Sequence, residues 1–308
     1  MAEKLLTLFT APKPFKDPHI SIIQNNALKS WMALGDRVEI IILGNDEGVA
    51  ENAKTLGIMH IPQVKCNTLG TPLISSMLRL TCEHSKSQIL GIVNTDIILF
   101  SDLIESVMKI SLQKEKFILI GQRWDMEVTK NLPEGADQFA RFKEKVIKVG
   151  KLHLPMGSDY FIFPRSCYTE IPDLTIGRAG WDNWFIFKSR WEGWPVVDAT
   201  HDVTVVHQNH DYRHLPGGQP HYRLPETREN VLRGGGEQTI FTIFDAQYSL
   251  INGGLKRKKT SMKKIFREIE IFPMTILKSM TLGKLFYFAF RPRKAYHAAR
   301  NFFKGNQG

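Results

Sequence analysis

Asn94, Thr95 and Asp96, in the middle of the chain, have the residue types and spacing of a cation site. They separate the apolar run Ile89–Val93, which is typical of a strand buried on both faces, from a second run, Ile97–Leu99. In open parallel sheets, ligands bind at the carboxyl ends of the strands, and a carboxylate there can hold a hard divalent cation that neutralises a diphosphate. We interpret Asp96 as such a ligand, because an unpaired charge between apolar runs is costly; the alternative is an ordinary turn.

A second stretch that can do chemistry is centred on Asp182. Gly180 and Trp181 precede it and an apolar helix is predicted to follow, so Asp182 stands near a helix N-terminus, where the helix dipole favours its ionised form. Four of the six tryptophans fall in this helix and its exit: Trp181, Trp184, Trp191 and Trp194. A carboxylate framed by rings can act as a general base towards a hydroxyl, which is our interpretation of Asp182; the alternative is a helix cap.

The Arg-Trp-Asp stretch at residues 123–125 follows a strand predicted at 117–120 and combines a cation, a large ring and a carboxylate. Sugars are bound by this mixture, with a ring under the C–H face and planar polar groups on the hydroxyls. Contacts to an acceptor or to the donor sugar are predicted for five residues: Arg123, Trp124, Asp125, Asp159 and Trp181. Two alternatives stay open, because Trp124 can fill the core beside a structural ion pair and Asp159 can pair with a nearby cation.

The histidines are concentrated late in the chain, with five of the ten between residues 201 and 221. Imidazole is a common metal ligand, so at least one of them is expected to bind a metal or a phosphate. His207 comes directly after a strand predicted at residues 203–206, and for that reason we prefer it to His210 and His214.

Strand-like and helix-like segments alternate along the chain and position these groups. Strands are predicted at 5–9, 38–43, 58–61, 89–93, 117–120, within 157–164, at 196–198 and at 203–206, and helices at 20–34, 47–56, 72–84, 102–112 and 137–149. This alternation implies a right-handed, mainly parallel, three-layer α/β arrangement. Thr10, Ala11 and Asp46 follow the first two strands and are expected at the same sheet edge as Asp96. The sequence contains neither a dinucleotide fingerprint nor a P-loop, so a metal at Asp96 would have to bind the phosphates.

The composition is that of an ordinary soluble protein, since 43% of the 308 residues are hydrophobic and 23% are charged. Cys66, Cys82 and Cys167 form no Cys-x-x-Cys pair, and three cysteines cannot all be bridged within one chain, which indicates a reducing compartment. The apolar run at the N-terminus is too short for a signal peptide. We therefore expect a cytoplasmic protein.

The net charge of +10 comes from the C-terminal segment. Residues 251–308 have 14 Lys and Arg against only Glu268 and Glu270, whereas residues 1–250 have 27 basic and 29 acidic residues. We therefore expect an α/β domain at 1–250, a basic amphipathic helical tail at 251–308, and no nucleic-acid partner. Basic amphipathic helices lie on anionic membranes, so residues 256–303 are predicted to hold the protein on the inner face of a membrane. The alternatives are a solvated helix pair packed on the domain and, third, a protein or nucleic-acid partner.

The order of these features resembles the nucleotide-sugar-dependent glycosyltransferases of GT-A fold, family 2 in particular. Asn-Thr-Asp at 94–96 stands where an Asp-x-Asp motif is expected, Gly-Trp-Asp-Asn at 180–183 follows well downstream, and His207 stands where many members have a late metal-binding histidine. The resemblance covers about residues 5–250. It implies a Rossmann-type three-layer sandwich and the transfer of a sugar from a nucleotide-sugar donor to a hydroxyl of a glycan or lipid-linked acceptor, as in the synthesis of a polysaccharide or glycolipid.

The resemblance also implies roles for single residues. Asp96 would bind Mn²⁺ or Mg²⁺, and His207 would be a further ligand of the metal or of the diphosphate. Asp182 would match the base of inverting members, so inversion at the anomeric carbon is expected. The nucleotide would be surrounded by Thr10, Ala11, Asp46 and Asn94. The chain departs from the motif at Asn94, which replaces the first Asp and contributes no charge to a metal site.

Two other functions fit the same residues. One is a noncatalytic protein that binds a nucleotide sugar or a glycan, and Asn94 is the feature in its favour. The other is a sugar-nucleotide nucleotidyltransferase. It is disfavoured because residues 10–15 lack the glycine-rich, basic signature that activates a triphosphate.

Overall fold

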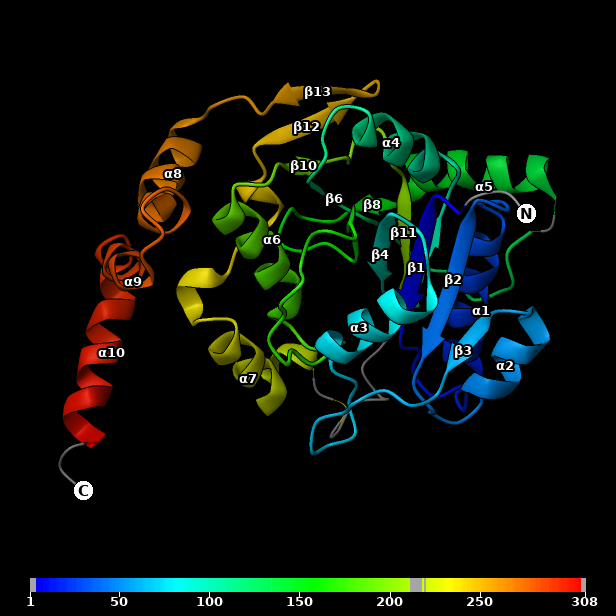
Figure 1. Ribbon diagram of the computed structural model, residues 1–308, viewed down its shortest axis with the longest axis horizontal. Coiled ribbons are helices and arrows are strands. Elements are labelled where there is room, and N and C mark those ends of the chain that lie inside the picture. The colour runs from blue at the N-terminus through cyan, green and yellow to red at the C-terminus, as the bar shows by residue number, and fades with distance from the viewer. Residues whose placement is uncertain (1–3, 134, 211–217, 219, 306–308) are drawn as a thin grey trace.

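The computed structural model describes residues 4–133, 135–210, 218 and 220–305 (Figure 1). The strands are β1 (Leu6–Thr10), β2 (Val38–Leu43), β3 (Met59–Ile61), β4 (Ile89–Val93), β5 (Ile97–Leu99), β6 (Ile118–Ile120), β7 (Trp124–Met126), β8 (Lys151–Leu152), β9 (Tyr160–Pro164), β10 (Val196–Asp198), β11 (Val205–Gln208), β12 (Tyr248–Ile251) and β13 (Gly254–Arg257). The helices are α1 (Pro18–Met32), α2 (Val49–Leu56), α3 (Ile74–His84), α4 (Asp102–Ser111), α5 (Ala136–Val149), α6 (Trp181–Glu192), α7 (Pro225–Arg233), α8 (Met262–Thr275), α9 (Met280–Ala289) and α10 (Pro292–Gly305). Short 3₁₀ helices lie between β11 and β12: η2 (His221–Arg223), η3 (Glu237–Thr239) and η4 (Ile243–Asp245).

A nine-stranded sheet forms the centre of the molecule, in the order β13-β12-β10-β6-β9-β4-β1-β2-β3. The pairs β1–β2, β1–β4, β2–β3, β6–β10 and β10–β12 are parallel. β9 is antiparallel to both of its neighbours, β4 and β6, and β12–β13 is an antiparallel hairpin at the sheet edge. The mainly parallel α/β sheet that the sequence predicts is therefore confirmed.

Helices cover both faces of this sheet. The side chains of each strand alternate between the two faces, and both faces are apolar, so each must be buried by helices. Leu6 and Leu8 of β1 join a buried cluster with residues of α1, α2 and α4, including Trp31. Phe9, the next residue along β1, points to the other face and joins the opposite cluster with residues of α3, α6 and α8, including Met77. The result is the predicted three-layer sandwich.

A second, four-stranded sheet, in the order β5-β11-β7-β8, begins where β4 ends. β5 follows β4 after the three residues Asn94, Thr95 and Asp96, and it pairs antiparallel with β11. β11 pairs in parallel with β7, which pairs antiparallel with β8. Residues 94–96 therefore form the connection between the two sheets.

Two predictions about the edges of strands are wrong. His207 is not in a loop after residues 203–206, because β11 runs from Val205 to Gln208 and His207 pairs with Ile97 of β5. Pairing with β5, which was not predicted, extends the strand by two residues. Thr10 likewise is the last residue of β1 and is buried, instead of standing in the loop.

The C-terminal segment forms three helices after the hairpin β12–β13. The N-cap residues of α8 and α9 are Ser261 and Ser279. Their hydroxyls accept hydrogen bonds from backbone N–H groups three residues later. Lys278, with a φ of 54°, lies in the turn between these two helices. The central sheet continues to Arg257, across the division expected at residue 250, and the separation into two domains stays a prediction. Within the described residues, no helix is long and apolar enough to cross a membrane.

Candidate active site

A cavity of about 840 Å³ lies at the carboxyl ends of β1, β2 and β4. Ten of the predicted site residues line it: Thr10, Ala11, Asp46, Asn94, Asp96, Arg123, Asp159, Trp181, Asp182 and His207. The topology explains this gathering, since parallel strands end at one edge of the sheet and antiparallel β9 begins there. A second cavity, of about 890 Å³, lies by α3 and α6 and contains none of these residues, so the first is the candidate active site.

Gln208 of β11 holds the backbone of Asp96 in place. Its backbone carbonyl oxygen accepts hydrogen bonds from the backbone N–H of Gln208 at 3.1 Å and from Gln208 Nε2 at 3.2 Å. The same Nε2 donates to the carbonyl of Ile23 on α1 at 2.8 Å, and Gln208 Oε1 accepts from Asn26 at 3.1 Å. This buried amide fixes the direction in which the Asp96 carboxylate enters the cavity.

Asp96, His207 and His210 converge in the cavity, each offering one ligand atom within 4.8 Å of the others. Asp96 Oδ1 is buried and makes no hydrogen bond to the described residues, and buried polar atoms of this kind are normally satisfied. A carboxylate oxygen and two imidazole nitrogens are a ligand set for a divalent metal. The residues therefore fit the metal predicted at Asp96 and His207, and they add His210, which the sequence interpretation had ranked below His207. His214 lies outside the described residues.

Lys13, which was not singled out in the sequence, reaches the same point. Its Nζ lies 3.5 Å from Asp96 Oδ2 and 3.1 Å from His210 Nε2, and that Nε2 lies 3.1 Å from Asp96 Oδ2. Two hydrogen bonds to the side chain of Gln24 hold the Lys13 backbone. Burial raises the pKa of the Asp96 carboxyl, but the charge of Lys13 and the hydrogen bond with His210 together lower it by more. This pKa therefore lies well below its usual range.

A chain of polar contacts, with Arg123 at its centre, connects the 94–96 segment to His207. Asn94 Nδ2 donates to Asp159 Oδ1 at 2.9 Å, and Arg123 bridges the next two carboxylates, donating to Asp159 Oδ2 at 2.6 Å and to Asp125 Oδ1 at 2.9 Å. Asp125 Oδ1 in turn lies 3.4 Å from His207 Nδ1. Asp159 therefore pairs with a cation, which was one of the alternatives left open, while it also lines the cavity.

Trp124 and Asp125 do not line the cavity, contrary to the sugar-contacting position predicted for them. The Trp124 ring packs against a buried cluster that contains Ile98, Phe100 and Val206. Asp125 accepts a hydrogen bond from Arg123 and lies 2.7 Å from His153 Nδ1. Because β7 alternates its side chains, the ring turns into the small sheet's core, which is the structural alternative named for this stretch.

Asp182 is the second residue of α6, and its carboxylate borders the cavity. Its Oδ1 accepts a hydrogen bond at 3.1 Å from the N–H of Gly180, which has a φ of 103° that only glycine adopts readily. Burial raises the pKa of Asp182 to about 6, although backbone N–H groups of Asn183 and Gly180 lower it; the charge of Asp159 raises it too. A carboxyl with this pKa is ionised at neutral pH and remains basic enough to accept a proton.

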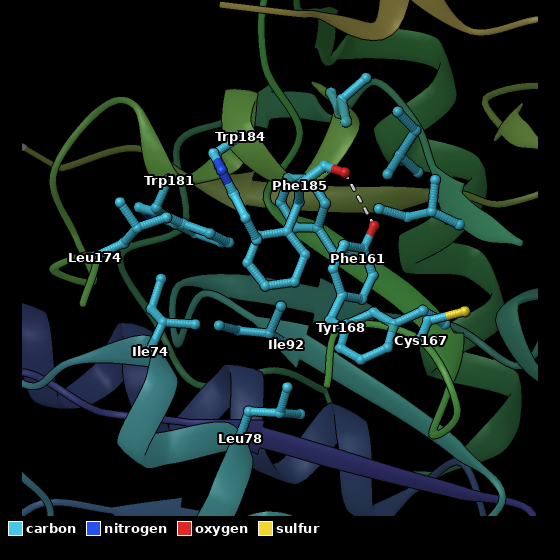
Figure 2. Close-up of a cluster of buried hydrophobic side chains, with 14 of the residues drawn as sticks. Ile74, Leu78, Ile92, Phe161, Cys167, Tyr168, Leu174, Trp181, Trp184 and Phe185 are labelled. Atoms are coloured by element: carbon cyan, nitrogen blue, oxygen red, sulfur yellow. Dashed lines mark hydrogen bonds between the residues drawn. The ribbon is translucent and has the colours of Figure 1, made fainter. Parts of the chain in front are cut away.

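The aromatic residues of α6 form the wall behind Asp182. Trp181 is buried with its ring centroid 5.0 Å from that of Phe161 on β9, and Phe185 is completely buried beside both. Figure 2 shows these rings facing Ile74 and Leu78 of α3, with Tyr168 donating a hydrogen bond to the carbonyl of Phe185. These rings therefore belong mainly to the core. Of the four tryptophans in α6 and just after it, only Trp181 borders the cavity.

Arg178 is a further cavity residue that sequence reasoning passed over. Its Nε donates to Glu226 Oε2 at 2.5 Å, and Glu226, which is buried, also accepts from Asn67 at 2.6 Å and from Thr71 Oγ1 at 2.8 Å. The two charges are 48 positions apart in the sequence, so only the fold reveals the pair. It joins α7 to the loops before α3 and α6.

Thr10 and Asp46, both predicted near the nucleotide, differ in burial. Thr10 is buried, and its Oγ1 lies 2.7 Å from Thr95 Oγ1, so this hydroxyl pair ties β1 to the 94–96 segment. Asp46 is exposed at the end of β2.

No family model matches this chain, and no curated protein matches it. Solved structures do. TarS from Staphylococcus aureus, in complex with UDP-GlcNAc, aligns over 93% of this chain and 76% of its own, with a TM-score of 0.50 and 11% identity. The chain has a GT-A-like fold.

Two further solved structures are similar over 67% of this chain. They are mannosyltransferase PcManGT from Pyrobaculum calidifontis in complex with GDP-Man and Mn²⁺, with a TM-score of 0.43 and 11% identity, and glucosyl-3-phosphoglycerate synthase from Mycobacterium tuberculosis in complex with phosphoglyceric acid, with a TM-score of 0.40 and 13% identity. The chain spans 57% of the length of PcManGT and 73% of the synthase. At these identities the likeness concerns the fold alone.

Proposed function

We propose that the protein is a glycosyltransferase that moves a sugar from a nucleotide-sugar donor to a hydroxyl of a glycan or lipid-linked acceptor. The observation that carries this proposal is the pairing, in one cavity, of a half-buried Asp/His/His cluster with a separate carboxylate whose pKa lies near 6. In glycosyl transfer the leaving group must be stabilised and the acceptor hydroxyl must be deprotonated. The Asp/His/His cluster suits the first task and the separate carboxylate suits the second. The GT-A-like fold supports the same reading.

The donor is proposed to bind across Asp96. Thr10, Ala11, Asp46 and Asn94 surround the nucleotide in this proposal. A divalent cation bound by Asp96, His207 and His210 would supply Lewis-acid stabilisation of the departing diphosphate. Of the two predicted cations, we propose Mn²⁺, because Mg²⁺ is normally bound by oxygen ligands and this set contains two imidazoles. Lys13, beside Asp96, adds a positive charge for the phosphate oxygens.

The transfer step is proposed to proceed with inversion. The acceptor hydroxyl oxygen attacks the anomeric carbon of the donor and forms the new C–O bond, while the bond to the diphosphate oxygen breaks and its electron pair leaves with the nucleoside diphosphate. Asp182 takes the hydroxyl proton. Arg123, Asp159 and Trp181 also line the cavity and are proposed to orient the acceptor or donor sugar. The same geometry without turnover describes the noncatalytic binding protein.

Thermal stabilisation by nucleotides tests the donor site. The wild-type protein is heated with a panel of nucleoside diphosphates and nucleotide sugars, each with Mn²⁺, with Mg²⁺ and with a chelator. We expect one nucleotide to raise the melting temperature in a metal-dependent way, because a ligand that binds only the native state stabilises it. Asp96→Ala and His210→Ala should lose this effect, whereas His84→Ala, which changes an exposed histidine on α3, should keep it. No stabilisation by any nucleotide would contradict the proposal.

Turnover separates the enzyme from the binding protein. Nucleoside diphosphate release from the donor that gives stabilisation is measured for the wild type and for Asp182→Asn. Loss of a general base is expected to lower kcat by about 10²- to 10⁴-fold with donor binding retained. Equal rates in the two proteins would remove Asp182 from the mechanism, and no rate in either would favour the binding protein.

The remaining predictions concern place and organisation. A cytoplasmic location is proposed from the cysteines, all three of which are free in the structure. We also propose a division into residues 1–250 and 251–308. Contact with a membrane is proposed for residues 256–303, and the argument for it rests on the C-terminal helices.

A further inference from the structure

α8 is fixed to the body of the protein by one side only. Arg267 donates to Asp245 and Glu270, and Lys264 donates to the carbonyl oxygens of Phe244 and Ala246. The same side contributes Ile271 and Met274 to the core cluster beneath α6. The orientation of the helix about its own axis is therefore determined by buried charge and packing.

The opposite side of α8 is apolar and exposed to solvent. Five residues spaced three or four apart form a continuous stripe on this side: Met262, Ile265, Ile269, Phe272 and Ile276, which are 65%, 41%, 46%, 45% and 63% exposed. Phe266, 54% exposed, lies beside the stripe. An amphipathic helix in a soluble protein normally buries its apolar residues. α8 does bury Ile271 and Met274 on one side, but it leaves a second apolar stripe exposed on the other.

α9 repeats this arrangement. It faces the body with Gly283, where a Cβ would collide with the Met274 side chain, and with Tyr287, whose hydroxyl donates to Glu237 at 2.5 Å. Its outer side exposes Leu282, Leu285, Phe286 and Phe290. The rings of Phe286 and Phe290 stack on one another with centroids 6.5 Å apart. We call these residues and the α8 stripe, taken together, the outer apolar face.

The exposed charged residues of the C-terminal segment are basic, and one of them, Lys294, pairs with Glu237 of η3. Exposed basic residues precede and accompany the outer apolar face: Lys256, Arg257, Lys259, Lys263, Lys278, Lys284, Arg293, Lys294 and Arg300. The two acidic residues of the segment, Glu268 and Glu270, are occupied by ion pairs with Arg190 and Lys264 and with Arg267 and Arg291. The solvent-facing charge of the tail is thus positive, and its apolar residues form rows instead of isolated points.

We propose that the outer apolar face inserts into the interface of an anionic lipid bilayer, with the surrounding lysines and arginines on the phosphate headgroups. An apolar row flanked by basic residues is complementary to a surface that is apolar below and negative above. The helices of the described residues are too short and too charged to cross the bilayer, so the contact is along its surface. Figure 1 places α8, α9 and α10 in succession along one edge of the molecule, beyond α6 and α7. This inference deepens the membrane contact proposed above for residues 256–303, and it does not depend on the proposed chemistry of the cavity.

Vesicle flotation of the full-length protein tests the inference. Binding is compared between vesicles of phosphatidylcholine alone and vesicles of equal parts phosphatidylcholine and phosphatidylglycerol, at low and high salt. We expect binding about tenfold tighter to the anionic vesicles, and a weaker preference at high salt. Equal binding to both kinds of vesicle, or binding to neither, overturns the proposal.

Two variants locate the contact. The triple variant Phe266→Gln, Phe272→Gln and Phe286→Gln changes only exposed rings, so the fold should be kept, and vesicle binding should fall about tenfold or more. The matched control, Leu112→Gln with Val149→Gln, changes exposed apolar residues of the body and should bind like the wild type. If the triple variant binds vesicles normally but loses a concentration-dependent dimer, the outer apolar face is a contact between copies of the chain and the membrane proposal is wrong.

Discussion

Asn94 and Asp159 are joined by two hydrogen bonds: the backbone N–H of Asn94 donates to the Asp159 carbonyl oxygen at 3.0 Å, and Asn94 Nδ2 donates to Asp159 Oδ1 at 2.9 Å. The other carboxylate oxygen of Asp159 accepts from Arg123. An amide can donate a hydrogen bond and an ionised carboxylate cannot. The adjacent Asp159, immediately before β9, therefore accounts for an amide at the first position of the Asn-Thr-Asp motif.

Restoring an acidic residue at this position should destabilise the protein. In Asn94→Asp, two carboxylates would face each other across the distance of the lost hydrogen bond, and the partner of Asp159 Oδ1 would be missing. We expect the free energy of unfolding at pH 7, with a chelator present, to fall by about 1–3 kcal/mol in urea denaturation. Asn131→Asp, at an exposed position, serves as the control. An unchanged stability of Asn94→Asp would contradict this explanation.

Removing the Lys13 charge should change metal and nucleotide binding in opposite directions. Lys13→Met frees Asp96 from a competing cation, so Mn²⁺ alone should bind about two- to fivefold more tightly, an effect kept small because the Lys13 side chain is 32% exposed. Nucleoside diphosphate should bind more weakly. Isothermal titration measures both. Lys16→Met is the matched control, since Lys16 also lines the cavity but pairs with Glu47; similar results for the two variants would argue against the role of Lys13.

The raised pKa of Asp182 predicts a pH-dependent stability difference. The folded protein holds a proton on this carboxyl up to about pH 6, whereas the unfolded chain releases it near the ordinary value of 3.8, so ionisation costs stability as the pH rises between these values. Asp182→Asn avoids this cost. Its stability relative to the wild type should increase from about pH 4 to pH 6 and then level off, by up to about 3 kcal/mol.

Denaturant unfolding at a series of pH values gives the measurement. Asp36→Asn, at an exposed position, controls for the loss of one carboxyl. A difference between Asp182→Asn and the wild type that stays flat from pH 4 to pH 7 would mean that burial does not raise this pKa in solution.

The aromatic wall behind Asp182 should be costly to open. Phe185 is completely buried, with its ring centroid 4.6 Å from that of Tyr168 and 5.8 Å from that of Trp181. Phe185→Ala is expected to lower the free energy of unfolding by about 3–5 kcal/mol in urea denaturation. Phe266→Ala, which removes an exposed ring, should stay within about 0.5 kcal/mol of the wild type. Similar losses for both would show that the ring cluster is not the core that its burial indicates.

The large sheet was predictable because its strands are short apolar runs with clear ends. The bounds predicted for β2, β4 and β10 agree with the structure, and those of β1 and β6 differ by one residue. The small sheet was not predictable in full. β5, β7 and β8 have two or three residues each, and their partners lie far away in the sequence, so no local pattern distinguishes them from loops.

The candidate site was predictable where a residue follows a strand of the large sheet, as Asn94 and Asp96 do. It was less predictable where the side chain reaches across the cavity. Lys13 is a lysine in a proline-rich loop, and two hydrogen bonds between its backbone and the Gln24 side chain hold the loop from which it reaches Asp96. His210 was ranked below His207 because the strand was expected to end at residue 206; pairing with β5 determines which histidines face Asp96.

Asp96 and His210 are 114 positions apart, and they meet only where β5 and β11 pair. A cation shared by these two residues would act as a removable cross-link around more than a third of the chain. Closing so long a loop restricts the unfolded ensemble, and the cross-link would have to break before β11 separates from β5. The small sheet and the cavity would then exchange amide hydrogens as one unit, at a rate that the free metal concentration controls, while the far side of the large sheet exchanges independently.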